Sequence, residues 1–185
     1  MSHSKYYAMF SKGAPESGSA QRKAIFAAVK IVIFCIGEPR SAFIREGIED
    51  YTARIKHYAP IETVAISEKK HWRKLPPEER KKAEGEAILA ELQPGDRAVL
   101  LDEKGVAHTS RAFAKKLEQH LASGGKRLVF IVGGAFGFSP EVYAAVQPKM
   151  ALSAMTFNHE MVLLFLTEQL YRAFSILNNG PYHND

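Results

Sequence analysis

The stretch LVFIVGGAFGFS, residues 128–139, decides the fold of this chain. Its five opening residues are all apolar, which is typical of a strand covered on both faces of a parallel sheet. The strand runs directly into Gly133 and Gly134. Ser139 and Pro140 then begin a helical pattern, with serine as the N-cap and proline in the first turn. This order of strand, glycine turn and helix predicts one unit of an α/β domain.

The same alternation extends in both directions from this unit. Strand patterns lie at 30–37, 61–67, 94–102 and 149–155, and helical patterns lie at 41–58, 69–92, 109–125 and 158–177. Alternating strands and helices predict an α/β fold with a mainly parallel sheet and helices on both faces. The last helical pattern is apolar on nearly every side. We therefore expect it to pack on a second copy of the chain, as a homodimer.

The ends of the chain differ in composition from its centre. Residues 1–28 show no sustained period and contain the small, polar run KGAPESGSAQ, which predicts a flexible leader ahead of one domain at 29–185. A targeting sequence, or a true start at Val29, stays open for this segment. Residues 1–28 carry +3 of the net charge of +5, so the overall charge says little about partners.

Several classes of protein are disfavoured by composition. The single cysteine, Cys35, lies in an apolar run, which excludes an intrachain disulfide framework and predicts a reducing, cytoplasmic location. The histidines lack the spacing of a metal site, so no metal is expected. The longest apolar run near the C-terminus, MVLLFL, is too short for a membrane span, and we expect no membrane partner.

Two segments could bind a ligand at the ends of strands. Gly133 and Gly134 follow a strand where parallel sheets bind ligands, but the pattern is neither G-x-G-x-x-G nor a P-loop, and a plain glycine turn is the alternative. The segment LSAMTFNHEM, residues 152–161, carries His159 to the start of the last helix. The helix dipole disfavours a protonated imidazole there, although a capping or packing role is the alternative.

The C-terminal segment EQLYRAFSILNNGPYH, residues 168–183, holds a third group of candidates. Glu168 and Arg172 are four residues apart, which also fits a simple ion pair on a helix face. Tyr182 and His183 stand where many chains end in a bland tail. From residue types alone, a disordered tail and a working site are both open.

Together these segments resemble one family. LVFIVGGAFGFS, LSAMTFNHEM, EQLYRAFSILNNGPYH and the early KIVIFCIG are similar to the ribosomal RNA large subunit methyltransferase H family, in the same order and over about residues 29–184. Members are bacterial SPOUT-class enzymes with a trefoil knot at the C-terminus. The resemblance implies methyl transfer from S-adenosylmethionine to N3 of a pseudouridine in large-subunit ribosomal RNA, by homodimers acting on assembled ribosomes.

The resemblance also implies which residues act. The cofactor site would comprise Leu101, Gly133 and the backbone of Leu152, Ser153, Ala154, Met155, Thr156 and Phe157. Arg172, Tyr182 and His183 would lie near the transferred methyl group, with His159 as a further candidate. Because N3 of the ring must lose a proton, His183 or His159 would accept it, and the choice between them stays open. Arg172 would hold a ring oxygen or a phosphate.

The chain departs from the family pattern at three positions. Asn158 replaces a proline, Leu163 an arginine, and Ala135 a proline or serine. The lost arginine leaves an alternative open, which is a ribosome-binding or RNA-binding module of the same fold with weak or lost catalysis. A small-ligand enzyme that reuses the glycine turn is a third hypothesis, which the tail disfavours. The basic loop KKHWRK, residues 69–74, fits either an RNA contact or a solvated loop.

Overall fold

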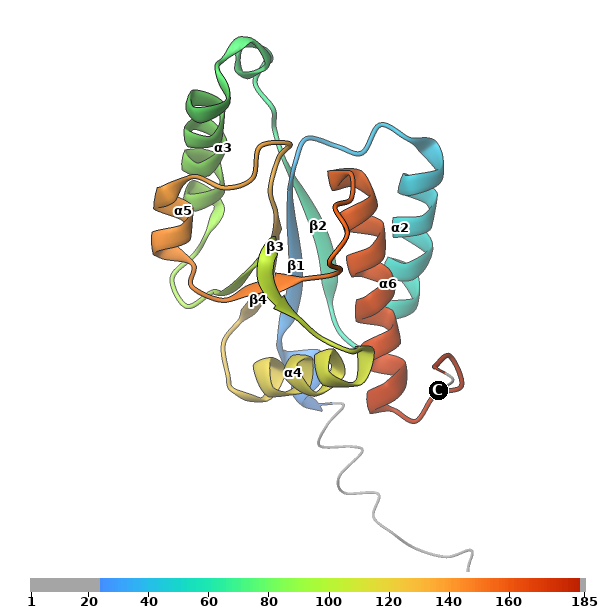
Figure 1. Ribbon diagram of the computed structural model, residues 1–185. Coiled ribbons are helices and arrows are strands. Elements are labelled where there is room, and N and C mark those ends of the chain that lie inside the picture. The colour runs from blue at the N-terminus through green and yellow to red at the C-terminus, as the bar shows by residue number, and fades with distance from the viewer. Residues whose placement is uncertain (1–23, 184–185) are drawn as a thin grey trace, which may run out of the picture.

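One parallel sheet organises residues 24–183, the part of the chain that this computed structural model describes (Figure 1). Its strands are β1 (Lys30–Ile36), β2 (Ile61–Ile66), β3 (Arg97–Ala107), β4 (Arg127–Val132) and β5 (Lys149–Ala151), in the spatial order β2-β1-β4-β3-β5. Every neighbouring pair in this order is parallel. The glycine turn therefore leaves the sheet at its centre, from the end of β4.

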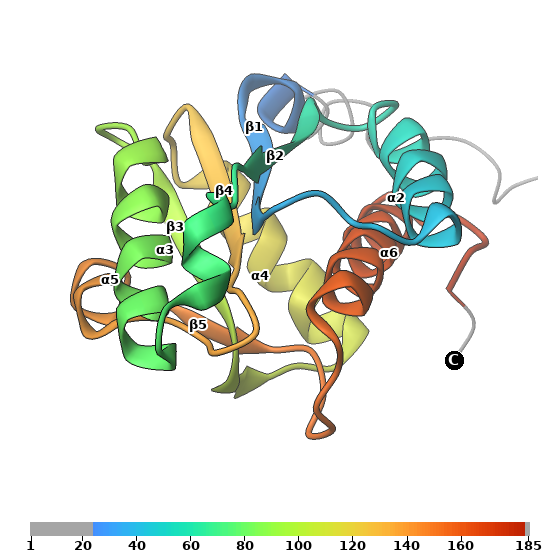
Figure 2. The ribbon, with the colours of Figure 1, turned by 90° about the horizontal axis from the view of Figure 1, so that it is seen from above.

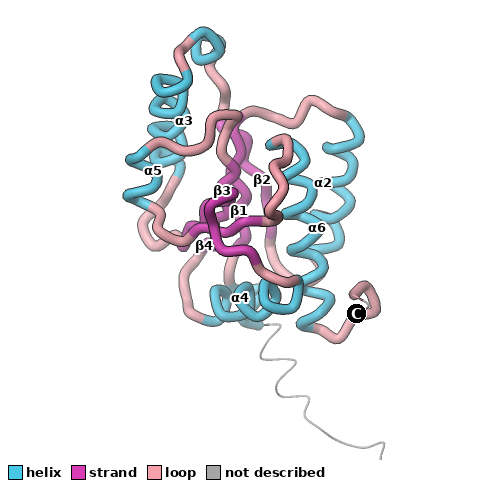
Figure 3. The backbone as a smooth tube through the Cα atoms, in the orientation of Figure 1, coloured by secondary structure: helices cyan, strands magenta, loops and turns pink. Residues whose placement is uncertain are grey.

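The helices cover both faces of the sheet, as Figures 2 and 3 show. One layer holds α2 (Ala42–Ile55), α4 (Ser110–Ala122) and α6 (His159–Leu177), and the other holds α3 (Pro77–Glu91) and α5 (Pro140–Ala145), with a short 3-10 helix η1 (Lys70–Lys74) before α3. The predicted α/β class with helices on both faces is confirmed. The trefoil knot that the resemblance implies stays a prediction.

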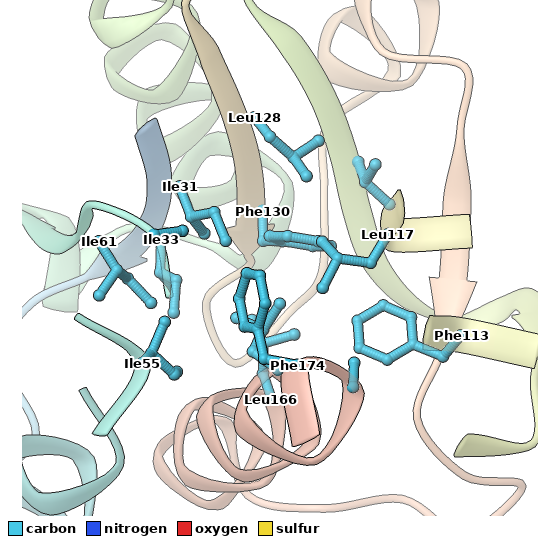
Figure 4. Close-up of a cluster of buried hydrophobic side chains, with 14 of the residues drawn as sticks. Ile31, Ile33, Ile55, Ile61, Phe113, Leu117, Leu128, Phe130, Leu166 and Phe174 are labelled. Carbon is cyan, nitrogen blue, oxygen red and sulfur yellow. The ribbon is translucent and has the colours of Figure 1, made fainter. Parts of the chain in front are cut away.

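The consecutive apolar residues of β1 explain how a single strand serves two cores. Ile31 and Ile33 join the buried cluster under α2, α4 and α6, whereas Val32 and Phe34 join the cluster under α3 and α5. Alternate side chains of a strand point to opposite faces, so a strand covered on both sides needs apolar residues at every position. Figure 4 shows the first cluster, in which Ile31 and Ile33 of β1 share one core with Phe113 and Leu117 of α4 and with Leu166 and Phe174 of α6.

Polar side chains fix where the helices begin. Thr109 accepts a backbone N–H of α4 at 3.2 Å, and Asn158 accepts one of α6 at 2.8 Å. Ser41 occupies the N-cap position of α2 without a side-chain capping bond. Instead, the Glu160 carboxylate accepts the backbone N–H groups of Arg40 and Ser41 at 3.1 and 3.2 Å. This carboxylate ties the start of α2 to the start of α6.

The strand predicted at 94–102 runs on to Ala107, so its predicted end at Asp102 is wrong. The pairing of β3 with β5 shifts register between Leu101 and Val106. A Cβ on Gly105 would lie 2.6 Å from the backbone of Met150, so glycine lets the two strands cross closely. The residues after Asp102 make an irregularity within β3 and do not end it, because β3 pairs with β5 again beyond them.

Part of the predicted leader packs on the domain. Residues 24–28 are helical, and Phe26 is only 1% exposed, with its ring edge-on to Phe174 of α6 at 5.4 Å. The packed region therefore includes residues before Val29. The rest of the predicted leader, residues 1–23, lies outside the described residues.

The C-terminal helix is covered more fully by its own chain than its sequence predicts. Leu166, Leu170 and Phe174 are completely buried between α2, α4 and the sheet. The expectation that only a second copy could bury this helix is therefore wrong, because α2 and α4 flank it on both sides. Half-buried residues remain on the outer side of α6 and are accessible to a second copy of the chain. The homodimer therefore stays a prediction.

Candidate functional site

A cavity of about 490 Å³ opens beside the ends of β3, β4 and β5. Seven of the eight predicted cofactor residues line it, namely Leu101, Gly133, Leu152, Ser153, Met155, Thr156 and Phe157. The eighth, Ala154, lies exposed between two of them. Ligands of parallel sheets bind beyond the carboxyl ends of the strands, and the volume suits a small molecule. The structure thus brings together segments that are about 20 to 50 residues apart in sequence.

The glycine turn, residues 133–137, forms one wall of this cavity. The N–H of Gly137 donates to the carbonyl of Gly134 at 3.1 Å, and Gly137 has a φ of +78°, which L side chains rarely adopt. A Cβ on Gly134 would lie 2.2 Å from Oε2 of Glu84. Glycine at position 134 therefore lets the turn pack directly against Glu84, where a side chain would have no room.

Glu84 of α3 supports the turn from the side away from the cavity. Its side chain is buried, and its Oε1 accepts a hydrogen bond from Nε of Arg80 at 2.7 Å. Its Oε2 has no hydrogen-bond partner within the described part of the chain. The only sequence signal for this residue is its spacing of four from Ile88, which places both on the buried face of α3.

The loop from Leu152 to Phe157 forms the opposite wall. Ser153 Oγ accepts the backbone N–H of Met155 at 2.9 Å, which shapes the turn. The Phe157 ring packs against Phe165 of α6 at 4.9 Å. Met155 is 73% exposed at the mouth. This loop therefore offers backbone groups and apolar surface on a frame tied to β5 and α6.

Tyr143 and Asp102 also line the cavity, and no sequence motif marked Tyr143. The tyrosine hydroxyl donates a short hydrogen bond to Oδ2 of Asp102. Burial, followed by this bond to the carboxylate, raises the pKa of Tyr143 to about 12. Lys149 lies 4.6 Å from the centre of the tyrosine ring. The pair is a fixed, neutral donor joined to a carboxylate within β3, one residue past the last pairing of β3 with β4.

His159 is the first residue of α6 and lines the cavity from the helix start. Asn158, and not Thr156, caps the helix, so the histidine ring is not needed as a cap. His159 is exposed, and it also lines a second, neighbouring cavity. Of the four predicted catalytic residues, it is the one beside the predicted cofactor site.

The other three gather at the far end of α6, in a group that we call the tail cluster: Tyr51, Glu168, Arg172, Tyr182 and His183. Oε1 of Glu168 accepts hydrogen bonds from Arg172 Nε and from the Tyr182 hydroxyl, each at 3.0 Å. Arg172 also reaches Nδ1 of His183 at 3.3 Å, and the hydroxyls of Tyr51 and Tyr182 are 3.0 Å apart. The C-terminal segment is thus folded back on α2 and α6, not extended as a bland tail.

Electrostatics fix the charges within the tail cluster. The Glu168 carboxylate, which accepts its hydrogen bond, raises the pKa of Arg172. Burial, followed by the bonds to Tyr51 and Glu168, raises the pKa of Tyr182 well above its usual value. The Arg172 guanidinium also lies 4.7 Å from the centre of the Tyr182 ring. At neutral pH the cluster holds a permanent cation beside a neutral phenol.

The tail cluster and the cavity beside β3, β4 and β5 are separate within one chain. None of Arg172, Tyr182 and His183 is among the residues that line the cavity. His159 and Arg172 are thirteen residues apart on one helix, which is about 20 Å at about 1.5 Å per residue. The structure therefore assembles two halves of the predicted site and keeps them at opposite ends of α6.

A second cavity of about 360 Å³ lies beside the ends of β1 and β2. Its charged lining residues are Arg40, Arg73, Arg80, Glu38, Glu68 and Glu160. Glu68 accepts hydrogen bonds from Arg73 at 2.7 Å and from Arg80 at 2.9 Å, and the Arg73 bond is the main cause of its lowered pKa. Three cations and three carboxylates thus balance. Gly134 and Ala135 line both cavities, so the glycine turn separates them.

Residues 24–183 contain no group of three or more histidine, cysteine, aspartate or glutamate side chains placed to hold a metal ion. Over the same range, each helix is too short or too polar to cross a membrane.

A protein-family model described as "Predicted SPOUT methyltransferase" matches residues 29–183. The chain belongs to the SPOUT methyltransferase family. The match spans the whole sheet, both cavities and the tail cluster. The resemblance inferred from the glycine turn and the C-terminal motif is confirmed at the level of the family.

Curated relatives of this SPOUT methyltransferase carry a more specific name. Proteins called ribosomal RNA large subunit methyltransferase H are 46% identical in Parabacteroides distasonis and 43% identical in Porphyromonas gingivalis, over 157 residues that cover 85% of this chain and all of each relative. The protein of that name from Christiangramia forsetii is 44% identical over 154 residues, covering 83% of this chain and 98% of its own.

Proposed function

We propose that this SPOUT methyltransferase transfers the methyl group of S-adenosylmethionine to N3 of a pseudouridine in large-subunit ribosomal RNA. The substrate would be the assembled ribosome, in the cytoplasm. The observation that carries this proposal is the cavity at the sheet edge, lined by residues that the family motif assigns to the cofactor. The names of relatives matched over their whole length support the choice of substrate.

The cavity fits the cofactor by size and by chemistry. Leu101, Leu152 and Met155 offer apolar contact to a flat adenine, and the loop backbone offers donors and acceptors for its edge. Gly133, Gly134 and Gly137 line the cavity without side chains, so the methionine part could approach their backbone. Ser153, on the opposite wall, supplies a hydroxyl.

The cofactor supplies an electrophilic methyl group on a sulfonium, whose sulfur keeps the electron pair of the broken bond. N3 of the ring provides the electron pair of the new bond, and its proton must leave. His183 or His159 accepts that proton. Arg172, a permanent cation held by Glu168, stabilises the negative charge that appears on a ring oxygen.

A homodimer joins the two halves of the site. Met161, Phe165, Glu168 and Arg172 follow one another at helical spacing on the half-buried side of α6. If two copies pack these stripes antiparallel about a two-fold axis, the end of one helix meets the start of the other. Arg172 of the partner subunit would then approach the cofactor cavity, which a single chain keeps about 20 Å away.

The test measures methyl transfer from labelled S-adenosylmethionine to ribosomes from a strain that lacks this enzyme. Wild-type protein should label the ribosomal RNA at N3 of one pseudouridine. Two inactive variants, Gly134→Val in the cavity wall and His183→Ala in the tail, should regain activity when they are mixed and refolded together. Activity would return because one mixed dimer contains an intact cavity opposite an intact tail. No recovery, from variants shown to form mixed dimers, would exclude a shared site.

The alternative, a ribosome-binding module without efficient catalysis, rested on Leu163 in place of arginine. Leu163 is 2% exposed and belongs to the core under α6, so this departure lies inside the fold. The same assay separates the two functions. Ribosome binding without methyl transfer by the wild-type protein would favour the binding module.

A further inference from the structure

Exposed apolar side chains are concentrated at the mouth of the cofactor cavity. Among residues 24–183, the exposed large hydrophobics are Phe43, Val106, Phe136, Met155 and Phe157, and the last three line this cavity. A single exposed apolar residue is ordinary, whereas a group at one opening marks a binding surface. Phe136 is the one on the glycine turn, and it is 46% exposed.

The Phe136 ring is held in place from behind. The Arg80 guanidinium lies 5.5 Å from the centre of the ring, within the range of a cation–π contact. Arg80 itself is fixed by Glu84 at 2.7 Å and Glu68 at 2.9 Å, and its side chain is only 18% exposed. An aromatic ring whose neighbours are already ordered loses little freedom on binding a flat partner.

The position of Phe136 suits a substrate and not the buried part of a cofactor. The turn that carries it separates the two cavities, because Gly134 and Ala135 line both. A strand of RNA that places one base at the cavity mouth must continue past this wall. In the second cavity three arginines are balanced by three carboxylates, so net charge gives no reason for a phosphate to settle there.

We infer that Phe136 is a stacking platform for an unpaired base that neighbours the methylated nucleotide. The inference rests on the proposed function, and it concerns a residue to which the family resemblance assigns no role. Unpaired bases of RNA are commonly bound by stacking on aromatic side chains. Arg80, held by Glu84 and Glu68, positions the ring. Stacking of a base on the ring requires no additional charged residue.

The test compares Phe136→Ala with Phe136→Trp in dimers of otherwise wild-type sequence. Loss of one stacked base should raise the KM and the Kd for ribosomes by about 5- to 100-fold, with kcat at saturating ribosomes and the Kd for S-adenosylmethionine within about twofold of wild type. Tryptophan should restore ribosome affinity. Because no ion pair is lost, the salt dependence of binding should keep its slope. Phe43→Ala, an equally truncated exposed phenylalanine that lines neither cavity, is the matched control.

Other outcomes would overturn the inference. Weaker cofactor binding in Phe136→Ala would make the ring a cofactor contact, and a shift from dimer to monomer would make it a subunit contact. Ribosome affinity equal to wild type would remove it from substrate binding. If the wild-type protein itself neither bound nor methylated ribosomes, the proposed function would fail first, which the same measurements report separately.

Discussion

The two ends of α6 are built by different means. At the start of the helix, the cavity beside β3, β4 and β5 has walls of backbone, with the glycine turn on one side and the loop 152–157 on the other. At its end, the tail cluster consists of long polar side chains that converge on one carboxylate, Glu168. The first region is shaped by how closely backbone segments pack, and the second by hydrogen bonds between side chains.

This difference predicts how each region fails. A backbone wall tolerates few added atoms, because neighbouring atoms in a packed interior cannot move aside cheaply. A side-chain cluster tolerates small changes in shape but depends on charge and on each donor. Changes in the cavity should therefore alter cofactor affinity, and changes in the tail cluster should alter the rate.

The largest effect is expected from His183→Ala. It should lower kcat by about 100-fold, the lower end of what a general base contributes, while the cofactor Kd and the melting temperature stay near wild type. Methyl-transfer assays measure the rate, isothermal titration calorimetry measures the cofactor Kd, and differential scanning calorimetry measures the melting temperature. His57→Ala, which removes an exposed histidine just after α2, is the control. An unchanged rate would remove the tail from the mechanism, and the same assay on His159→Ala would then test the other histidine.

A smaller effect, mainly on cofactor affinity and less on rate, is expected from Gly134→Ala. The added Cβ would lie 2.2 Å from Glu84 Oε2, so the turn or the buried carboxylate must shift. We expect about tenfold weaker binding of S-adenosylmethionine by calorimetry, with kcat at saturation changed less than affinity. Ala135→Ser in the same turn should bind normally. A double variant with Glu84→Ala should recover part of the affinity, since it removes the clash, and strictly additive losses would contradict this account.

Tyr182→Phe should have a modest effect on stability. It removes the hydroxyl that joins Tyr51 to Glu168 and keeps the aromatic ring on Tyr171. We expect a loss of about 1 kcal/mol in the free energy of unfolding, or about 2–4 °C in melting temperature, by calorimetry. Tyr58→Phe, which keeps a ring stacked on Phe174, should change stability less. Equal effects of the two variants would mean that the tail cluster does not hold the C-terminus.

The smallest effect is confined to alkaline pH. Because the folded protein raises the pKa of Tyr143 from 10.0 to about 12, its contribution to stability is complete below pH 10 and is lost as the pH rises toward 12. Urea unfolding of wild type and of Tyr143→Phe should therefore differ less at pH 11 than at pH 8. A difference that stays constant over this range would show that burial and Asp102 do not raise the pKa of the phenol.

The fold could largely be predicted from the sequence because its signals are local. The apolar run of β4 and the serine and proline of α5 indicate their elements without reference to anything distant in the chain. The strand end at Asp102 could not be predicted, since β3 continues only because β5 pairs beside it. The prediction of what buries α6 was wrong for the same reason, because the burial of α6 depends on where α2 and α4 pack.

For the candidate site, the sequence alone determined which residue types stand at strand ends and at the C-terminus, because motifs and periodicity are properties of neighbouring residues. It left His159 and His183 equivalent. Only the tertiary structure decided that one lies at the cavity beside β3, β4 and β5, and the other in the tail cluster. It also decided that Glu84 supports Gly134 and that Arg80 holds Phe136, since these contacts join α3 to a turn some fifty residues later. Distances between segments come from packing, which no local pattern contains.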